Sequence, residues 1–370
     1  MKTASKPHPL TPIRFNANRG LEFEKTLKKR VRQYFKDNGI SRSGNSTMII
    51  KAVVMMTVYF TPYFLMVLGI VTNPWLITLC WIVMGFGIGG IGMGIMHDAN
   101  HGSFSKNEMV NRLVGKVISL IGGYSANWKI QHNVLHHSYT NVTGYDEDID
   151  SPAPFLRFSP LTKRRKVHEY QHLFAWFFYG FLTLSWMLTK DFKQLFRYKK
   201  MGLTKIENEE FWRLLTELII FKVLYYGYIF AIPLIFMDTP WWGVLLGILL
   251  MHFVAGIILS VVFQLAHVVP DTVFPAIDDT HSVDNNWAVH QMQTTANFAP
   301  NNGLLSWMIG GLNYQIEHHL FPNICHVHYR KISEIVKKTA NEFGIPYHSE
   351  PTLISAIASH GRMLKQLGRV

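Results

Sequence analysis

The sequence predicts an all-α membrane protein with four transmembrane helices in two hairpins and a cytoplasmic helical cap. Three observations lead to this prediction. Hydrophobic residues make up 48% of the chain and charged residues only 16%, whereas about 25% of the residues of a soluble domain are charged. The apolar residues form four runs of about 20 residues or more, long enough to cross a bilayer as helices. The Lys and Arg residues behind the net charge of +12 lie mostly beside these runs, which fits an anionic membrane surface better than nucleic acid.

The predicted spans cover residues 48–71, 75–96, 214–237 and 241–269. Short turns at 72–74 and 238–240 join them in pairs, and neither turn contains Lys or Arg. The positive-inside rule therefore predicts that both termini and the segment 102–213 are cytoplasmic. Lys222 lies within the third span, where its ammonium group must face protein or a cavity rather than lipid.

The segments outside the spans complete the predicted organisation. Residues 1–47 are expected to form a cytoplasmic N-terminal arm with an amphipathic helix near 21–35, lying either on the membrane surface or in solvent. Residues 48–345 form the membrane domain, and residues 346–370 a cytoplasmic C-terminal tail. The aromatic segment 171–188 favours a helix at the membrane interface over a further span. The N-terminal residues lack an apolar core, so we expect no cleavable signal peptide.

The chain contains 18 histidines, many of them in three short motifs near predicted span ends. The motifs are HDANH (97–101), HNVLHH (132–137) and QIEHH (315–319), and a further histidine, His267, lies near the end of the fourth span. Histidines three or four residues apart share one helical face and can bind one metal ion. A single pair of this kind often arises by chance, but the predicted topology brings all four groups to the cytoplasmic side. Together they predict metal binding by His97, His101, His132, His136, His137, His267, Gln315, His318 and His319.

The residue types restrict the choice of metal. Two cysteines are too few for a thiolate site, whereas the imidazoles suffice for two metal ions. Neutral imidazoles beside a bilayer indicate oxygen chemistry on an apolar substrate, for which iron is the usual metal, although zinc and copper also suit imidazole. A histidine-rich metal transporter should place its ligands near the bilayer midplane within the spans. A haem protein needs only one or two of these histidines.

These motifs resemble those of the integral-membrane fatty acid desaturases, in the same order. The likeness continues through residues 136–150, 290–302 and 310–332, and Gln315 in place of a histidine resembles the front-end branch, which includes enzymes that act on linoleoyl-type chains. The resemblance implies a di-iron centre that uses O2 and two electrons to introduce a cis double bond into a fatty acyl chain, carried as acyl-CoA or as a lipid. It also implies that His267 is an additional ligand and that Gln315 takes the ninth ligand position, directly or through water.

The same resemblance leaves related reactions and the electron donor open. Hydroxylation, acetylenic bond formation and sphingolipid desaturation would use similar machinery. Many front-end relatives carry a fused cytochrome b5 domain with an HPGG motif, which does not occur in this sequence. We therefore expect a separate donor, such as a ferredoxin or cytochrome b5. The basic segments 163–166 and 199–200 would attract an acidic carrier, although they equally suit ordinary cytoplasmic flanks.

Metal-binding histidines need their second ring nitrogen held, usually by a carboxylate or a carbonyl. Asp98 and Glu317 within the motifs, Asp148 in the acidic run 146–150, and His290 are expected to fill this supporting role. The acidic run also suits a solvated loop. No separate acid or base is expected, because an unactivated methylene C–H bond is too strong for acid–base chemistry.

Overall fold

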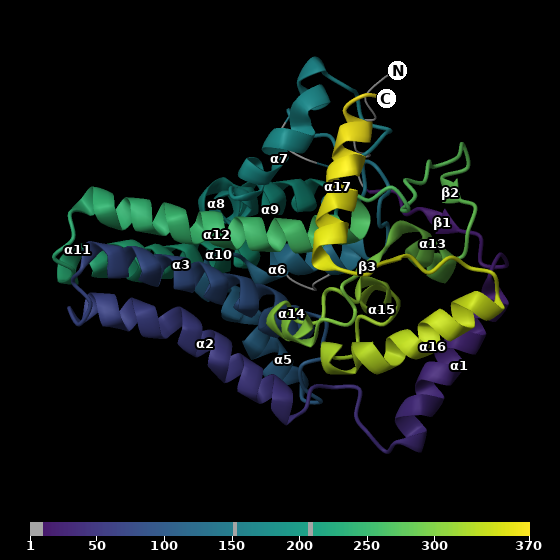
Figure 1. Ribbon diagram of the computed structural model, residues 1–370, viewed down its shortest axis with the longest axis horizontal. Coiled ribbons are helices and arrows are strands. Elements are labelled where there is room, and N and C mark those ends of the chain that lie inside the picture. The colour runs from purple at the N-terminus through teal and green to yellow at the C-terminus, as the bar shows by residue number, and fades with distance from the viewer. Residues whose placement is uncertain (1–9, 151–153, 206–209) are drawn as a thin grey trace. The chain divides into compact units, whose positions relative to one another are not determined.

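The computed structural model describes residues 10–150, 154–205 and 210–370, and these residues are mostly helical (Figure 1). The first nine residues of the predicted N-terminal arm lie outside the described part of the chain. The chain divides into two compact units, each assembled from separate stretches. We call them the histidine unit (residues up to 44, 129–175 and 262–370) and the bundle unit (residues 45–128 and 176–261).

Within the described residues, four helices are long and apolar enough to cross a membrane, and they overlap the four predicted spans closely. The second and third of these helices each contain a π-helical turn, in which backbone hydrogen bonds join residues five apart instead of four. The first helix is α2 (Ser46–Val67) and the fourth is α12 (Trp241–His267). The second consists of α3 (Pro74–Ile91), a π-helical turn (Gly92–Met96) and α4 (His97–Asn100). The third consists of α10 (Phe211–Tyr226), a π-helical turn (Gly227–Ala231) and α11 (Ile232–Phe236).

The first two of these helices begin at asparagine N-caps. The side-chain oxygen of Asn45 accepts a hydrogen bond from the backbone N–H of Thr47, and that of Asn73 accepts one from Trp75. Each cap satisfies a backbone donor that the first helical turn leaves without a partner. Pro74 occupies the first position of α3, where its missing N–H costs nothing.

Glycines in α3 allow its neighbours within the bundle unit to approach closely. A Cβ atom at Gly87 would lie 2.9 Å from the Cα of Tyr59 in α2, and one at Gly85 would lie 2.7 Å from the backbone oxygen of Met251 in α12. Figure 1 shows α2 and α3 side by side. Small residues are what lets apolar helices pack backbone to backbone in a membrane.

Lys222 faces protein, as its place within a span predicts. Its ammonium group donates hydrogen bonds to the carboxylate of Asp191 at 2.7 Å and to the carbonyl oxygens of Gly122 at 2.8 Å and Trp186 at 2.6 Å. The side chains of Lys222 and Asp191 are only 4% and 6% exposed. A buried charge persists only when it is paired and hydrogen-bonded in this way.

Shorter helices complete the bundle unit. The aromatic segment expected as one helix over 171–188 is instead broken near Gly180, where the backbone passes close to the ring of Phe253. The helices are α5 (Glu108–Gly115), α6 (Ser125–Lys129), α7 (Gln171–Tyr179), α8 (Leu182–Ser185) and α9 (Asp191–Lys200). The last residue of α6 and the first five residues of α7 belong to the histidine unit.

The histidine unit is built on the contact between α1 (Leu21–Asp37) and α16 (Tyr329–Glu342), which lie side by side (Figure 1). The helix α1 is amphipathic, as predicted. Its apolar residues, which include Phe23 and Leu27, are buried in a core shared with Ile332 of α16. The apolar face of α1 is therefore occupied by protein.

In the part of the chain that the structure describes, two very short pairs of parallel strands join distant segments of the histidine unit. β1 (Arg14–Phe15) pairs with β2 (Ser282–Val283), and β3 (Asn297–Phe298) pairs with β4 (Ser349–Glu350). The boundaries expected at residues 47 and 345 stay predictions. The remaining helices are α13 (Trp287–Thr294), α14 (Gly303–Met308), α15 (Gln315–Leu320) and α17 (Leu353–Leu367).

Candidate metal centre

The second histidine motif lies on a π-helical segment, Ile130–His136. Because a π-helix bonds residues five apart, the backbone N–H of His137 donates to the carbonyl of His132 at 2.9 Å. The Nε2 atoms of the two rings are 3.2 Å apart. An α-helical spacing would align residues four apart instead, so the π-helical segment decides which histidine pairs with which. Such turns frequently occur at functional sites.

A first group of three imidazoles forms where this segment meets α15. The Nε2 of His318 lies 2.9 Å from that of His137 and 3.4 Å from that of His132. Nitrogens that bind one ion at about 2.1 Å lie roughly 3.0–3.4 Å from one another, depending on the coordination angle. The three nitrogens therefore have the spacing of ligands around one ion.

A second group consists of His136, His267 and His319, all fully buried. One nitrogen from each ring lies within 4.8 Å of the others, close enough for one metal ion. The ring centroids are 4.7 to 4.8 Å apart. The histidine unit alone thus brings together six of the nine predicted ligands, in two groups of three.

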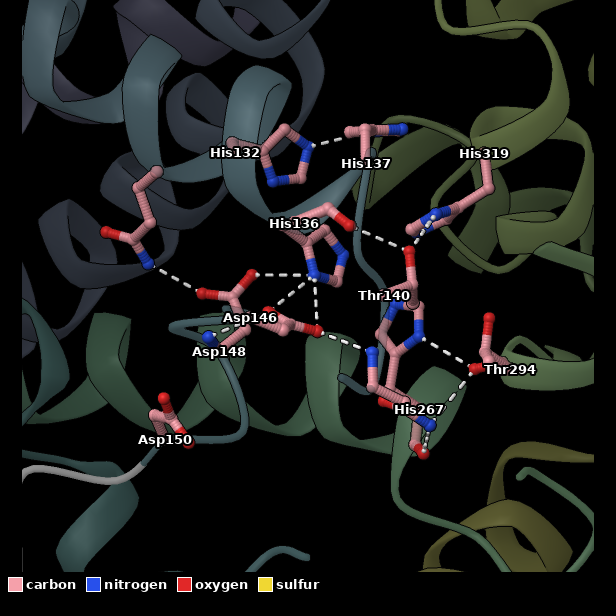
Figure 2. Close-up of polar contacts among 12 residues, drawn as sticks. His132, His136, His137, Thr140, Asp146, Asp148, Asp150, His267, Thr294 and His319 are labelled. Carbon is pink, nitrogen blue, oxygen red and sulfur yellow. Dashed lines mark hydrogen bonds and ion pairs between the residues drawn. The ribbon is translucent and has the colours of Figure 1, made fainter. Parts of the chain in front are cut away.

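Hydrogen bonds at the second ring nitrogen orient two of these rings (Figure 2). Nδ1 of His136 donates to the carboxylate of Asp146, whose two oxygens lie 3.0 and 3.1 Å away, and Nδ1 of His267 donates to the carbonyl of Thr294 at 3.2 Å. The proton on each ring is thereby placed on Nδ1, which leaves the lone pair on Nε2. Both Nε2 atoms are buried and have no hydrogen-bond partner among the described residues. This is the arrangement that metal-binding histidines require.

The carboxylates also set the charge around His136. Burial alone lowers the pKa of His136, but Asp146 and Asp148 outweigh burial and raise it to about 9. For Asp146 itself, burial raises the pKa of the carboxyl group, while His136 opposes this rise. A cation at this position, whether a proton or a metal ion, is therefore favoured by its surroundings.

The two histidines of α15 are held by residues that the sequence did not single out. The side-chain oxygen of Gln291 lies 2.8 Å from Nδ1 of His319, and the hydroxyl of Tyr329 lies 3.1 Å from Nδ1 of His318. Gln291 is itself positioned by a 2.9 Å hydrogen bond from the hydroxyl of Thr140. The one available signal was that Gln291 and Tyr329 belong to the segments 290–302 and 310–332, over which the family resemblance extends.

The other two predicted residues of the third motif differ in their surroundings. Nε2 of Gln315 is buried and has no hydrogen-bond partner among the described residues. Glu317 accepts hydrogen bonds from Asn297 and Tyr347, at 2.8 and 3.0 Å. Burial raises the pKa of Glu317 to about 7, against the effect of these two hydrogen bonds.

The remaining supporting residues lie in several settings. Asp148 accepts a hydrogen bond from Gln131 at 2.6 Å, and its carboxylate lies 3.4 Å from Nδ1 of His136. Asp150 instead accepts from the backbone N–H of Gly144 and stabilises the loop. The ring of His290 lies edge-on to the ring of Phe15 in β1, with 5.1 Å between the two ring centroids.

The first motif belongs to the bundle unit. His97 and His101 lie one helical turn apart in and just after α4, and their ring centroids are 4.8 Å apart. Both rings stand edge-on to Trp128, at 5.4 and 5.6 Å. The carboxylate of Asp98 lies 3.6 Å from Nδ1 of His97. These two imidazoles share one face of the helix, as the spacing predicts.

The imidazole nitrogens of the histidine unit are suitable ligands for metal ions. Two buried groups of imidazoles, with ring protons directed to Asp146 and Thr294, match the preferences of iron, zinc and copper. The fit rests on the spacing within each group and on the Nε2 atoms of His136 and His267, for which the described residues supply no hydrogen-bond partner. Nothing in this donor set suits magnesium or calcium, which prefer oxygen ligands.

Comparison with known proteins gives concordant similarities. A family model described as fatty acid desaturase matches residues 72–351. An sn-1 linoleoyl-lipid 6-desaturase of Arthrospira platensis is 36% identical over 357 residues, which cover 96% of this chain and 95% of that protein. A second protein of that name, from Synechocystis, is 34% identical over 96% of this chain and 98% of its own length. An acyl-lipid (8-3)-desaturase of Physcomitrium patens is 36% identical, covering 94% of this chain and 72% of its own.

Proposed function

Since this chain belongs to the fatty acid desaturase family and is a membrane oxidoreductase, we propose that it introduces a cis double bond into the acyl chain of a membrane lipid. The proposed reaction consumes O2 and two electrons at a pair of iron ions. The relatives aligned over nearly their whole length are named linoleoyl-lipid 6-desaturases. Their names favour an acyl lipid over acyl-CoA and a linoleoyl-type chain desaturated at position 6.

The observation that carries this proposal is the convergence of six buried imidazoles in two groups. We assign His132, His137 and His318 to one iron ion, and His136, His267 and His319 to the other. We further propose that His97, His101 and Gln315 supply additional ligands, Gln315 either directly or through water.

The chain's own residues have three tasks in this chemistry. Bound iron supplies the oxidising power needed to break an unactivated C–H bond. Asp146 and Thr294 keep Nδ1 of His136 and His267 protonated, so that the Nε2 lone pairs are available for binding. Burial of the rings excludes water, which protects the reaction from side reactions. No side chain is needed as a separate acid or base.

We also propose which side of the membrane carries the metal centre and what kind of protein supplies the electrons. Both termini, the helical cap and the metal centre are placed on the cytoplasmic side, with the spans arranged as two hairpins and the membrane domain extending over 48–345. Electrons would come from a separate carrier such as a ferredoxin or cytochrome b5. Support for an acidic carrier is the exposure of the four consecutive cationic residues 163–166.

Product analysis tests the reaction. A host that expresses the protein is fed linoleate, and new double bonds in its membrane lipids are located by mass spectrometry. We expect a new double bond at position 6 with the wild-type protein and none with His319→Ala. His348→Ala, a histidine outside both groups, should leave the product unchanged. A hydroxylated or acetylenic product would replace desaturation by a related reaction.

Metal analysis tests the centre separately. The purified protein should contain about two iron ions per chain, and His136→Ala should lower this content. Stoichiometric zinc in place of iron, or transport of metal ions by the protein in vesicles, would contradict the proposed enzyme.

A further inference from the structure

The third histidine motif contacts a hydrogen-bonded network that is buried apart from one half-buried tyrosine, and no ligand assignment uses this network. Its members are Asn297 of β3, Glu317 of α15, and Tyr347, which lies just before β4. The amide of Asn297 donates to one carboxylate oxygen of Glu317 at 2.8 Å and to the hydroxyl of Tyr347 at 2.8 Å. That hydroxyl donates to the other carboxylate oxygen at 3.0 Å. Glu317 and Asn297 are both fully buried.

The network also reaches the backbone of α15. The side-chain oxygen of Asn297 accepts a hydrogen bond from the backbone N–H of Ile316 at 2.9 Å. Asn297 thus binds the first turn of the helix twice, through Ile316 and through Glu317. A six-residue helix cannot maintain its own orientation, so contacts of this kind must fix the direction of α15.

The pairing of strands holds the network together. β3 and β4 align Asn297 with Ser349, and this brings Tyr347 beside Glu317. The rings of the neighbouring ligands are held by other residues, His318 by Tyr329 and His319 by Gln291. The carboxylate of Glu317 therefore acts on the helix as a whole, and its hydrogen bonds lead to β3 and Tyr347.

We propose that Asn297 and Tyr347 are positioning residues, which through Glu317 fix the orientation of α15 and so the directions in which Gln315, His318 and His319 point. This inference rests on the proposed function only for its statement that these three residues bind metal. A buried carboxylate leaves its full desolvation cost uncompensated when its donors are lost. The network is accordingly sensitive to single-atom changes.

The network is tested by exchanging the amide of Asn297 and the carboxylate of Glu317, because each side chain keeps its size in the exchange. Asn297→Asp places a second carboxylate beside Glu317 and removes the donor, so α15 should reorient. In the double variant Asn297→Asp/Glu317→Gln, the amide at 317 donates to the carboxylate at 297, and the hydrogen bond is restored in reverse. Tyr347→Phe removes a single hydroxyl and provides a milder perturbation.

The measurement is Co²⁺ binding to the purified, metal-free full chain, followed by visible absorption, which reports affinity and coordination geometry together. We expect Asn297→Asp to weaken Co²⁺ binding about 10- to 100-fold, as supporting residues do, and to change the absorption bands. The double variant should recover to within about threefold of wild type with the original bands. Tyr347→Phe should weaken binding about threefold to tenfold.

A matched control separates positioning from general damage. Asn286→Asp makes the same change at another buried asparagine, whose amide donates to Glu24 at 2.6 Å in the same unit. It should leave the Co²⁺ spectrum unchanged even where it lowers the melting temperature. Wild-type affinity in both Asn297→Asp and Tyr347→Phe, or a double variant no better than Asn297→Asp, overturns the positioning role alone. Failure of the wild-type chain to bind Co²⁺ would overturn the proposed metal centre as well.

Discussion

Replacing Asp146 with Asn should weaken metal binding at His136 while leaving the fold in place. The carboxylate accepts Nδ1–H of His136 and also the backbone N–H groups of Asn141 at 2.8 Å and Asp148 at 3.0 Å. An amide of the same size keeps only one oxygen as an acceptor. It cannot satisfy all three donors, and it removes the negative charge that favours a cation on the ring.

The expected loss of metal affinity depends on a second carboxylate, that of Asp148, near the same ring nitrogen of His136. Loss of the group that holds a ligand's second nitrogen costs about 10- to 100-fold in metal affinity, or about 1.4 to 2.7 kcal/mol. Asp148 lies 3.4 Å from the same nitrogen and can take over part of this role. We therefore expect a loss of about tenfold for Asp146→Asn, and of about 100-fold when Asp148→Asn is added.

The assay is competition for Fe²⁺ between the purified protein and a chelator of known affinity. Asp150→Asn is the matched control, because it makes the same change in the same loop at a carboxylate that binds the backbone of Gly144. The control should retain iron as wild type does. Equal iron affinity for wild type, Asp146→Asn and the double variant would refute the assigned role of Asp146.

Three further outcomes follow from the structure. Lys222→Met leaves the buried carboxylate of Asp191 without its cation and should cost about 3–5 kcal/mol of stability, seen as a lower melting temperature that Asp191→Asn partly restores. Gly87→Leu overpacks the contact between α2 and α3 and should cost about 1–3 kcal/mol, whereas Gly227→Ala, with no atom within 4 Å of its added methyl group, should be neutral. Burial lowers the pKa of His360 to about 4, below the unfolded value near 6.5. The unfolded chain then binds the extra proton, so the free energy of unfolding falls as the pH drops from about 7 towards 4. At pH 5, His360→Gln should reduce this pH-dependent loss of unfolding free energy by about 2 kcal/mol, measured by chemical denaturation.

The four apolar helices were predictable because their information is local. A run of apolar residues specifies a membrane helix by length alone, and an α-helical spacing of four residues places His97 and His101 on one face. The same spacing fails for His132 and His136, because the π-helical segment pairs His132 with His137 instead. Local reasoning also explains the burial of Lys222, since an ammonium group cannot face lipid.

The residues around the ligands were less accessible to sequence reasoning. Gln291 and Tyr329 have common residue types and reach their histidines only through tertiary folding. Within the acidic run, sequence reasoning favours Asp148 as the supporting carboxylate, yet Asp146 lies nearer to Nδ1 of His136. Only the turn of the loop decides between carboxylates two residues apart.

The amphipathic helix near residues 21–35 illustrates a different limit. Its periodicity predicts an apolar face but cannot say what covers it. In the structure that face meets α16, from the far end of the chain. The spacing of apolar residues along a helix is the same whether lipid or protein covers them.

The histidine unit is assembled from three separate stretches of the chain, so its metal-binding residues are synthesised at different times. His136 leaves the ribosome long before His319, roughly 10–40 s earlier at about 5–20 residues per second, and Tyr347 follows later still. Throughout that interval the second group of imidazoles is incomplete, and the early histidines are exposed to whatever metal ions the cell offers. The complete second group can therefore hold the proposed metal only after His319 has left the ribosome.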